Sequence, residues 1–380
     1  MKKGKKKAII ILLLSLFSFQ IDLNDARAEE QSDDIIHVRI LETTDLHANM
    51  LAYDYRKRKE TVEFGLTRTA SLIKKARKEV PNSLLFDVGD ALVGNPLGEY
   101  VSKNPLNTLD IHPVYKVMNT LNYDAATVGN HEFNYGLNFL LRSLRGADFP
   151  YVNANIYVDD HNNYEFDDLN YFNPYIIFEK EFKDSSGKRH PIKVGVIGLI
   201  TPIAAEWDKE TFIGKMKIKN MKQTAEHFIP IMKNKGADII VVLAHTGMDS
   251  DIGLKQKKGN SVYSISTIEG IDAILYGHTH SLFPIKDRYT EKEGIDLKAG
   301  TIHGTATVQA GYWGNHLGII DLTLVRKNGK WEVKNSRSYI KPIFRTVNDQ
   351  KIPVVPSDPL IEKIMEEPHR QTLEYINSKK

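Results

Sequence analysis

Residues 35–47, with the sequence IIHVRILETTDLH, join an apolar run that is typical of a β-strand to the motif Asp45-Leu46-His47. The same arrangement recurs four more times, because each further motif also follows a strand-like apolar run. These motifs are Gly89-Asp90, Gly129-Asn130-His131-Glu132, Ala244-His245-Thr246 and Gly277-His278-Thr279-His280. Since ligands in open α/β sheets bind at the carboxyl ends of strands, we expect the five motifs to form one site.

Helical patterns lie between these strands. Leu66, Ala70 and Ile73 share one face of a helix predicted at residues 64–78. Other helices are predicted at residues 113–121, 136–144, 221–235 and 358–376, and a Pro-containing linker is predicted at residues 350–357. After the last motif the pattern changes to strands without helices, at residues 305–310, 317–325 and 331–340. This order predicts an α/β protein built as a layered sandwich.

The motifs share side chains that bind divalent metal ions, namely carboxylates, imidazoles and one amide. Asp90 can bridge two cations with its two oxygens, and Gly89 lets the backbone turn sharply beside it. The chain has no cysteine, so a metal must bind to oxygen and nitrogen, which suits Mn, Zn, Fe, Co or Ni. The motifs hold enough donors for two cations that share one carboxylate, which is the equipment for hydrolysing a phosphate ester.

The first 28 residues are predicted to be a signal peptide outside the fold. Five lysines in residues 1–7 precede an apolar run at residues 8–19, and Ala26-Arg27-Ala28 has the pattern of a cleavage site. We therefore expect export, with the protein secreted, cell-wall associated or periplasmic. An uncleaved membrane anchor is the alternative, but the run is shorter than the about 20 residues that span a bilayer.

Removal of this segment changes the charge balance. The whole chain has 51 basic and 48 acidic residues, and residues 1–28 hold six and two of these, so 45 and 46 remain. This near-neutral balance does not indicate a nucleic-acid polymer as partner. We expect a monomer without stable membrane insertion after cleavage.

Longer stretches around the motifs carry a resemblance to a known family. They are LETTDLH (41–47), FGL (64–66), HPVYK (112–116), MNTLNYD (118–124), GNHEFNYG (129–136), YVNAN (151–155), NSVY (260–263) and YWG (312–314). The motifs resemble those of the calcineurin-like metallophosphoesterases, and these stretches resemble one branch, the bacterial 2′,3′-cyclic-nucleotide 2′-phosphodiesterase/3′-nucleotidases. The resemblance implies an αββα sandwich of two packed mixed β-sheets flanked by helices, with the catalytic domain at residues 29–345.

The resemblance also implies a set of metal ligands, divided between two divalent cations (Mn, Zn, Fe or Co). One cation is expected to bind to Asp45, His47, Asp90 and His280. The other is expected to bind to Asp90, Asn130, His245 and His278, so that Asp90 bridges the two.

His131 and Asn134 are the implied catalytic pair. His131 is expected to lie beside the phosphate and to protonate the leaving oxygen, while Asn134 holds its ring. Asn130 and His131 are the implied substrate contacts. The implied substrates are small molecules: 2′,3′-cyclic nucleotides, opened to 3′-nucleotides, and 3′-nucleotides, split into nucleoside and phosphate.

Two features differ from the family pattern. In the 5′-nucleotidase branch an aspartate orients the histidine of the Gly-Asn-His-Glu motif, whereas Asn134 stands here, which favours the cyclic-phosphodiesterase branch. Residues 346–380 are predicted to be a linker and a helix that would lead to an absent C-terminal nucleotide-binding domain. A truncated and weakly selective phosphoesterase, a 5′-nucleotidase and a metal-binding pseudoenzyme are the alternatives.

Overall fold

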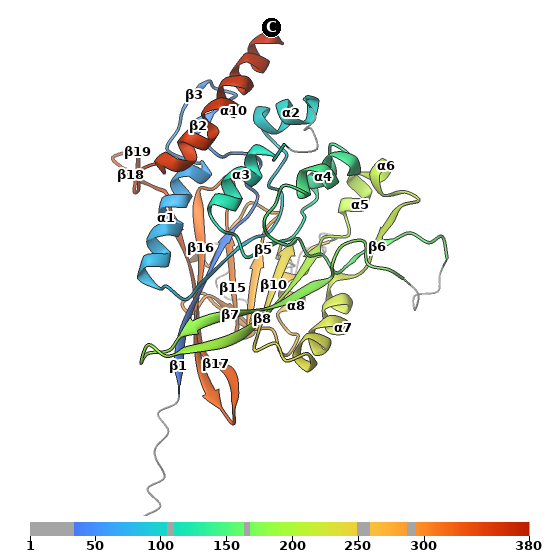
Figure 1. The fold of residues 1–380 in the computed structure, drawn as a ribbon, viewed down its shortest axis with the longest axis vertical. Coiled ribbons are helices and arrows are strands. Elements are labelled where there is room, and N and C mark those ends of the chain that lie inside the picture. Colours follow the sequence, from blue (N-terminus) through green and yellow to red (C-terminus); the bar gives the residue numbers. More distant parts are fainter. Residues whose placement is uncertain (1–33, 105–109, 163–167, 249–258, 287–292, 380) are drawn as a thin grey trace, which may run out of the picture. The chain divides into compact units, whose positions relative to one another are not determined.

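Two mixed β-sheets, packed face to face, lie at the centre of the computed structural model (Figure 1). The structure describes residues 34–104, 110–162, 168–248, 259–286 and 293–379. The predicted signal peptide lies outside these residues. None of the described helices has the length and apolar character needed to cross a membrane.

The first sheet has five strands, and three of them are parallel. In spatial order they are β17 (Lys330–Pro342), β16 (His316–Lys327), β1 (Ile35–Thr43), β4 (Ser83–Asp87) and β5 (Ala125–Ala126). Strand β1 pairs parallel with β4 and antiparallel with β16. The carboxyl ends of β1, β4 and β5 therefore lie at the same edge of the sheet, and each of them leads into one of the five motifs.

The second sheet has eight strands with a parallel centre. In spatial order they are β13 (Ile295–Asp296), β14 (Thr301–Ile302), β15 (Thr305–Ala310), β11 (Ala273–Tyr276), β10 (Ile239–His245), β8 (Arg189–Ile200) and β7 (Tyr175–Lys183), with β12 (Leu282–Phe283) paired to β15. Strands β8, β10, β11 and β15 are parallel. The other two motifs follow β10 and β11, so this sheet also directs its strand ends towards the site.

Apolar side chains from both sheets fill the space between them. Ile40 and Phe86 of the first sheet pack in one cluster with Val196, Val241 and Leu275 of the second, and each is at most 1% exposed. Strands covered on both faces read as continuous apolar runs, as β10 does. The predicted sandwich of two mixed sheets is thus confirmed.

Helices cover the outer faces of both sheets (Figure 1). Those on the first sheet are α1 (Leu66–Glu79), α2 (Pro96–Lys103), α3 (Pro113–Thr120), α4 (Leu137–Leu144) and α10 (Pro359–Ser378). Those on the second sheet are α7 (Met221–Asn234) and α8 (Val262–Ile265). Smaller elements are the hairpin of β2 (Tyr53–Asp54) with β3 (Lys59–Glu60), the antiparallel pair of β6 (Ile156–Val158) with β9 (Met216–Ile218), the 3-10 turn η1 (His131–Phe133), α5 (Ala204–Trp207) and α6 (Lys209–Phe212).

The structure corrects the linker predicted at residues 350–357. Strand β19 (Gln350–Pro353) occupies its first half and pairs antiparallel with β18 (Phe344–Val347). Asn348 and Asp349 form the turn, with φ angles of 48° and 60°. Because Asn and Asp tolerate this left-handed conformation, the pair is a hairpin signal that the Pro-containing composition concealed.

Helix α2 was not predicted, although the sequence marks its start. Asn95 accepts hydrogen bonds from the backbone N–H groups of Leu97 and Gly98, and Pro96 occupies the first turn. An asparagine cap followed by proline is a helix-start signal. The last helix does begin as predicted, since the side chain of Asp358 caps Leu360 and Ile361.

His112 gives the fold a predictable dependence on pH. It precedes α3, is fully buried, and accepts a hydrogen bond from the N–H of Val114 at Nδ1, 3.2 Å away. Burial lowers its pKa to about 3. Because the unfolded pKa is about 6.5, the stability contributed by neutral His112 is complete above that pH and is lost as the pH falls towards 3.

We expect His112 to make unfolding about 2 kcal/mol easier at pH 5 than at pH 7, because only the unfolded chain takes up the proton. His112→Asn keeps a capping oxygen and removes this titration. Urea unfolding at the two pH values should show a difference that is smaller in the variant by about that amount. The same pH dependence in both proteins would contradict the prediction.

Candidate active site

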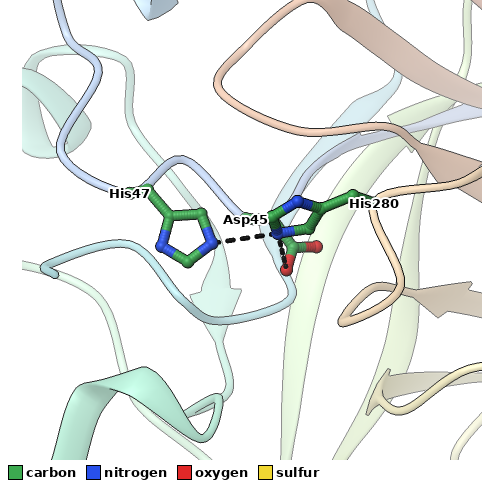
Figure 2. Close-up of side chains that lie close together, drawn as sticks. All are labelled: Asp45, His47 and His280. Atoms are coloured by element: carbon green, nitrogen blue, oxygen red, sulfur yellow. Dashed lines mark hydrogen bonds and ion pairs between the residues drawn. The ribbon is translucent and has the colours of Figure 1, made fainter. Parts of the chain in front are cut away.

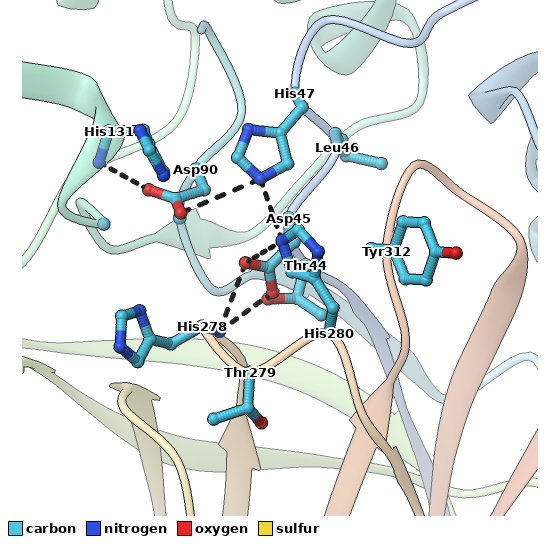
Figure 3. A network of polar contacts seen from close by, with 12 residues as sticks. Thr44, Asp45, Leu46, His47, Asp90, His131, His278, Thr279, His280 and Tyr312 are labelled. Carbon is cyan, nitrogen blue, oxygen red and sulfur yellow. Dashed lines mark hydrogen bonds and ion pairs between the residues drawn. The ribbon is translucent and has the colours of Figure 1, made fainter. Parts of the chain in front are cut away.

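The five motifs meet where the two sheets present their strand ends (Figure 3). Asp45 and His47 follow β1, Asp90 follows β4, and Asn130 follows β5. His245 ends β10, while His278 and His280 follow β11. The structure therefore brings all seven predicted metal ligands together. Five of them are buried, with at most 5% of the residue exposed, and His278 is half-buried. His280 is the most open, with 38% of its side chain exposed.

The backbone at these ligands is held in an unfavourable conformation. Asp45, His47, Asp90, His278 and His280 have φ angles of 51°, 46°, 56°, 73° and 54°. The left-handed region costs an L-residue about 1–2 kcal/mol. Five such residues at one place indicate a functional site, because the strain persists only where the surroundings impose it.

One group of convergent donors consists of Asp45, His47 and His280 (Figure 2). The Nε2 atoms of His47 and His280 are 3.0 Å apart, and that of His280 is 3.4 Å from Oδ1 of Asp45. The Nδ1 of His47 lies 2.6 Å from the carbonyl oxygen of Val93. Because a carbonyl oxygen can only accept, Nδ1 must carry the hydrogen and donate it in this bond, which leaves the Nε2 lone pair for a metal.

A second group surrounds Asn130. Its Oδ1 lies 3.1 Å from Nε2 of His245 and 2.9 Å from Nδ1 of His278. The carbonyl of Val88 fixes His245 in the same way, at 2.7 Å from Nδ1. Two imidazoles and an amide oxygen thus converge, and this donor set fits a divalent cation of the Mn, Zn, Fe or Co type.

Asp90 lies between the two groups. Its Oδ2 is 3.2 Å from Nε2 of His245 and 3.9 Å from Nε2 of His47. Oδ1 accepts the backbone N–H of His131 at 2.8 Å. The carboxylate therefore faces donors of both groups, which is the position that a bridging ligand requires.

The charges of the site favour the metal-binding forms of His278 and Asp90 but not that of His245. Burial and the charge of His245 lower the pKa of His278 to about 4, which keeps this imidazole neutral. Burial opposes the ionisation of Asp90, but the charge of His245 outweighs it and holds the pKa of Asp90 below its usual range. Burial also disfavours charged His245, yet Asp90 raises its pKa to about 10. A proton and a cation therefore compete for Nε2 of His245.

The predicted catalytic pair lies beside this centre. The ring of His131 is 5.2 Å from that of His47, centroid to centroid (Figure 3), and its Nδ1 is 2.6 Å from Oδ1 of Asn134. His131 is half-buried and Asn134 is exposed. The imidazole is thus held at the side of the site that solvent and a substrate can reach.

Glu132 has a role that the sequence analysis did not assign. Its buried carboxylate accepts backbone N–H bonds from Gly129 at 2.6 Å, Asp90 at 2.7 Å, Ala91 at 2.7 Å and Leu92 at 3.2 Å. It therefore joins the loop after β5 to the loop after β4. The only sequence signal for this role is the position of Glu132 inside the Gly-Asn-His-Glu motif.

Two aromatic rings flank the ligands and were also not predicted as part of the site. Tyr312 stacks on His280 with centroids 4.9 Å apart and an angle of 15° (Figure 3). Trp207, which is 54% exposed, lies 5.5 Å from the ring of His278. The glycine-rich turn around Tyr312 was visible in the sequence, but nothing local indicated Trp207.

This fold and this donor set define a metallophosphoesterase. The family model for calcineurin-like phosphoesterases matches residues 38–282, and the chain belongs to that family. The chain is 41% identical over 366 residues to the 2′,3′-cyclic-nucleotide 2′-phosphodiesterase/3′-nucleotidase of Yersinia enterocolitica, covering 96% of this chain and 54% of that protein. It is 43% identical over 342 residues to the protein of the same name from Salmonella typhimurium, covering 90% and 51%.

A solved structure is similar over its whole length. The calcineurin-like phosphoesterase YfkN from Bacillus subtilis superposes with a TM-score of 0.82 at 41% identity, covering 90% of this chain and 99% of that one. The predicted membership of the calcineurin-like family is confirmed, and the first two curated relatives bear the name of the predicted branch. The chain spans about half the length of the first two curated relatives.

We expect Glu132→Gln to destabilise the site, because the amide nitrogen of glutamine cannot accept the N–H groups that the lost oxygen accepted. Each unpaired buried donor costs about 1–3 kcal/mol, so unfolding should become easier by about 2–4 kcal/mol. Urea unfolding and bound-metal analysis measure the effect, with exposed Glu366→Gln as control. Equal stability and metal content in both variants would contradict this role.

Proposed function

We propose that this chain hydrolyses phosphate esters of nucleotides at a centre of two divalent cations. The observation that carries the proposal is the convergence of carboxylate, amide and imidazole ligands from five strand ends. Asp45, His47, Asp90 and His280 would hold one cation, and Asp90, Asn130, His245 and His278 the other. When bound, the two cations would acidify a water molecule and neutralise charge on the phosphoryl oxygens.

The chain's own residues have separate tasks in this reaction. Val93 and Val88 fix the rings of His47 and His245 through their carbonyl oxygens. Asp90 accepts the N–H of His131 and so places that residue beside the ligands. His131 would donate a proton to the leaving ribose oxygen, and together with Asn130 it would contact the substrate.

We propose 2′,3′-cyclic nucleotides and 3′-nucleotides as the substrates. Relatives that bear this name are 41–43% identical over 90–96% of this chain. Asn134 supports this choice over 5′-nucleotides, because the 5′-nucleotidase pattern has an aspartate there. Since the chain spans about half of those relatives, its own selectivity is part of the proposal.

We also propose export through the segment at residues 1–28. The lysine-rich start, the apolar run and the Ala-Arg-Ala site support it. N-terminal sequencing of the protein recovered outside the cytoplasm should begin at Glu29. Recovery of an intact Met1 terminus in the membrane fraction would favour an anchor instead.

We expect His278→Ala to lower kcat for every phosphate ester by more than about 100-fold, because a ligand of one cation is lost. Elemental analysis should show less bound metal than in the unaltered protein. His227→Ala, at an exposed histidine of α7, is the control and should retain both activity and metal. Full activity of His278→Ala with full metal content would contradict the assignment.

The substrate proposal is tested with the Mn²⁺-loaded chain on 2′,3′-cyclic AMP, 3′-AMP, 5′-AMP and bis(p-nitrophenyl) phosphate. We expect higher kcat/KM for the first two than for the others. Equal and slow turnover of all four would indicate an unselective phosphoesterase, and preference for 5′-AMP a 5′-nucleotidase. No turnover with two metals bound would favour a pseudoenzyme.

A further inference from the structure

The His131–Asn134 pair is the start of a longer chain of hydrogen bonds. Nδ1 of His131 lies 2.6 Å from Oδ1 of Asn134, and Nδ2 of Asn134 donates to Oδ2 of Asp208 at 2.9 Å. Asp208 is half-buried and lies between α5 and α6, 74 residues from Asn134. A carboxylate thus reaches His131 through an intervening amide.

The carboxylate fixes the direction of every bond in this chain. An ionised carboxylate only accepts hydrogen bonds, so the NH₂ group of Asn134 must face Asp208. The amide oxygen of Asn134 must then face His131, whose Nδ1 has to donate. As a consequence Nδ1 carries a proton, and Nε2 is the ring atom left for a substrate.

The side chain of Asp208 contacts Asn134 instead of capping the helix that follows it. It occupies the N-cap position of α6 with φ −115° and ψ 46°, and its side chain makes no capping hydrogen bond. Asn95, Asn220 and Asp358 do cap α2, α7 and α10. Capping by such side chains is worth about 0.5–2 kcal/mol, so the orientation of Asp208 towards Asn134 is not the local default.

Aromatic packing joins the segment that contains Asn134 to the segment that contains Asp208. The ring of Phe133 lies 4.7 Å from that of Phe212, centroid to centroid, and both side chains are buried. Phe133 follows His131 in the 3-10 turn η1, and Phe212 ends α6. This single packed contact, beside Asn134 in one segment and close to Asp208 in the other, therefore helps to fix the distance between Asp208 and Asn134.

We propose that Asp208 is a positioning residue that orients the Asn134 amide and, through it, the ring of His131 for proton donation to the leaving oxygen. This inference rests on the proposed function, in which His131 is the proton donor. In that step an oxygen of water bonds to phosphorus and its proton goes to solvent, the P–O bond to the ribose breaks, and the electron pair of that bond remains on the ribose oxygen, which takes the proton from Nε2. His131 is left neutral, and its Nδ1–H still donates a hydrogen bond to Oδ1 of Asn134. A proton from solvent then returns His131 to its charged form.

Leaving-group dependence tests the inference, because p-nitrophenolate departs without a proton whereas a ribose alkoxide needs one. The Mn²⁺-loaded chain is assayed on 3′-AMP and on p-nitrophenyl phosphate, two monoesters. We expect Asp208→Ala to lower kcat for 3′-AMP about three- to tenfold more than kcat for p-nitrophenyl phosphate, as the loss of one hydrogen bond allows. The KM for 3′-AMP should change less than kcat.

Asp208→Asn keeps an oxygen that can accept a hydrogen bond from Asn134. Its ratio of kcat for 3′-AMP to kcat for p-nitrophenyl phosphate should therefore be close to that of the unaltered chain. Glu210→Gln removes an exposed carboxylate from the same segment and should leave the ratio unchanged. If Asp208→Ala leaves this ratio unchanged, because kcat is unaffected or falls equally for both substrates, the inference is overturned. An Asp208→Asn variant as impaired as Asp208→Ala would also overturn it.

His131→Ala separates this inference from the proposed function. If it loses 3′-AMP hydrolysis selectively while Asp208→Ala does not, only the positioning role of Asp208 fails. If His131→Ala itself keeps the ratio of the unaltered chain, the proton-donor role on which the inference rests fails with it.

Discussion

The carboxylate of Glu132 makes the contact on which the rest of the site depends. Four backbone N–H groups from two loops converge on it in a fully buried position. Without an acceptor there, these donors would be buried and unpaired, which is costly for each of them. Because one loop carries Asp90 and the other carries Asn130 and His131, the same carboxylate fixes the spacing of these three residues.

A second constraint comes from the backbone strain at the site. Positive φ angles at five of the candidate metal ligands are unfavourable by themselves. Two packed sheets supply the rigidity that keeps them in place. The inter-sheet core of fully buried aliphatic side chains is therefore a condition for the site as well as for the fold.

The surroundings of His131 illustrate how a change in one motif can be offset elsewhere. Asn134 replaces the aspartate that the 5′-nucleotidase pattern has, and an amide stabilises a charged imidazole less than a carboxylate does. The structure places the carboxylate of Asp208 behind that amide. The same segment places Trp207 against the ring of His278. Residues 207 and 208 therefore contact the site at two places, His278 and Asn134.

Much of this protein was determined locally by its sequence. Apolar runs of the right length predicted β1, β4 and β10, and the candidate metal ligands could be predicted because each belongs to a short motif at the end of a strand. The elements that were not predicted include α2, whose cap signal lies at Asn95, the short helices α5 and α6, and the β18–β19 hairpin, whose Asn348-Asp349 turn lies in Pro-containing surroundings. These errors came from short signals that compete with stronger composition.

Tertiary structure alone decided which residues support the ligands. Glu132 acts on backbone groups about 40 residues earlier, Tyr312 stacks on a ring 32 positions before it, and Asp208 reaches Asn134 across 74 residues. No periodicity or spacing encodes such contacts, because they arise from the packing of two sheets and the segments between their strands. The sequence by itself therefore indicated which residues could bind metal, whereas the packing decided the orientation of those residues and the groups that hold them.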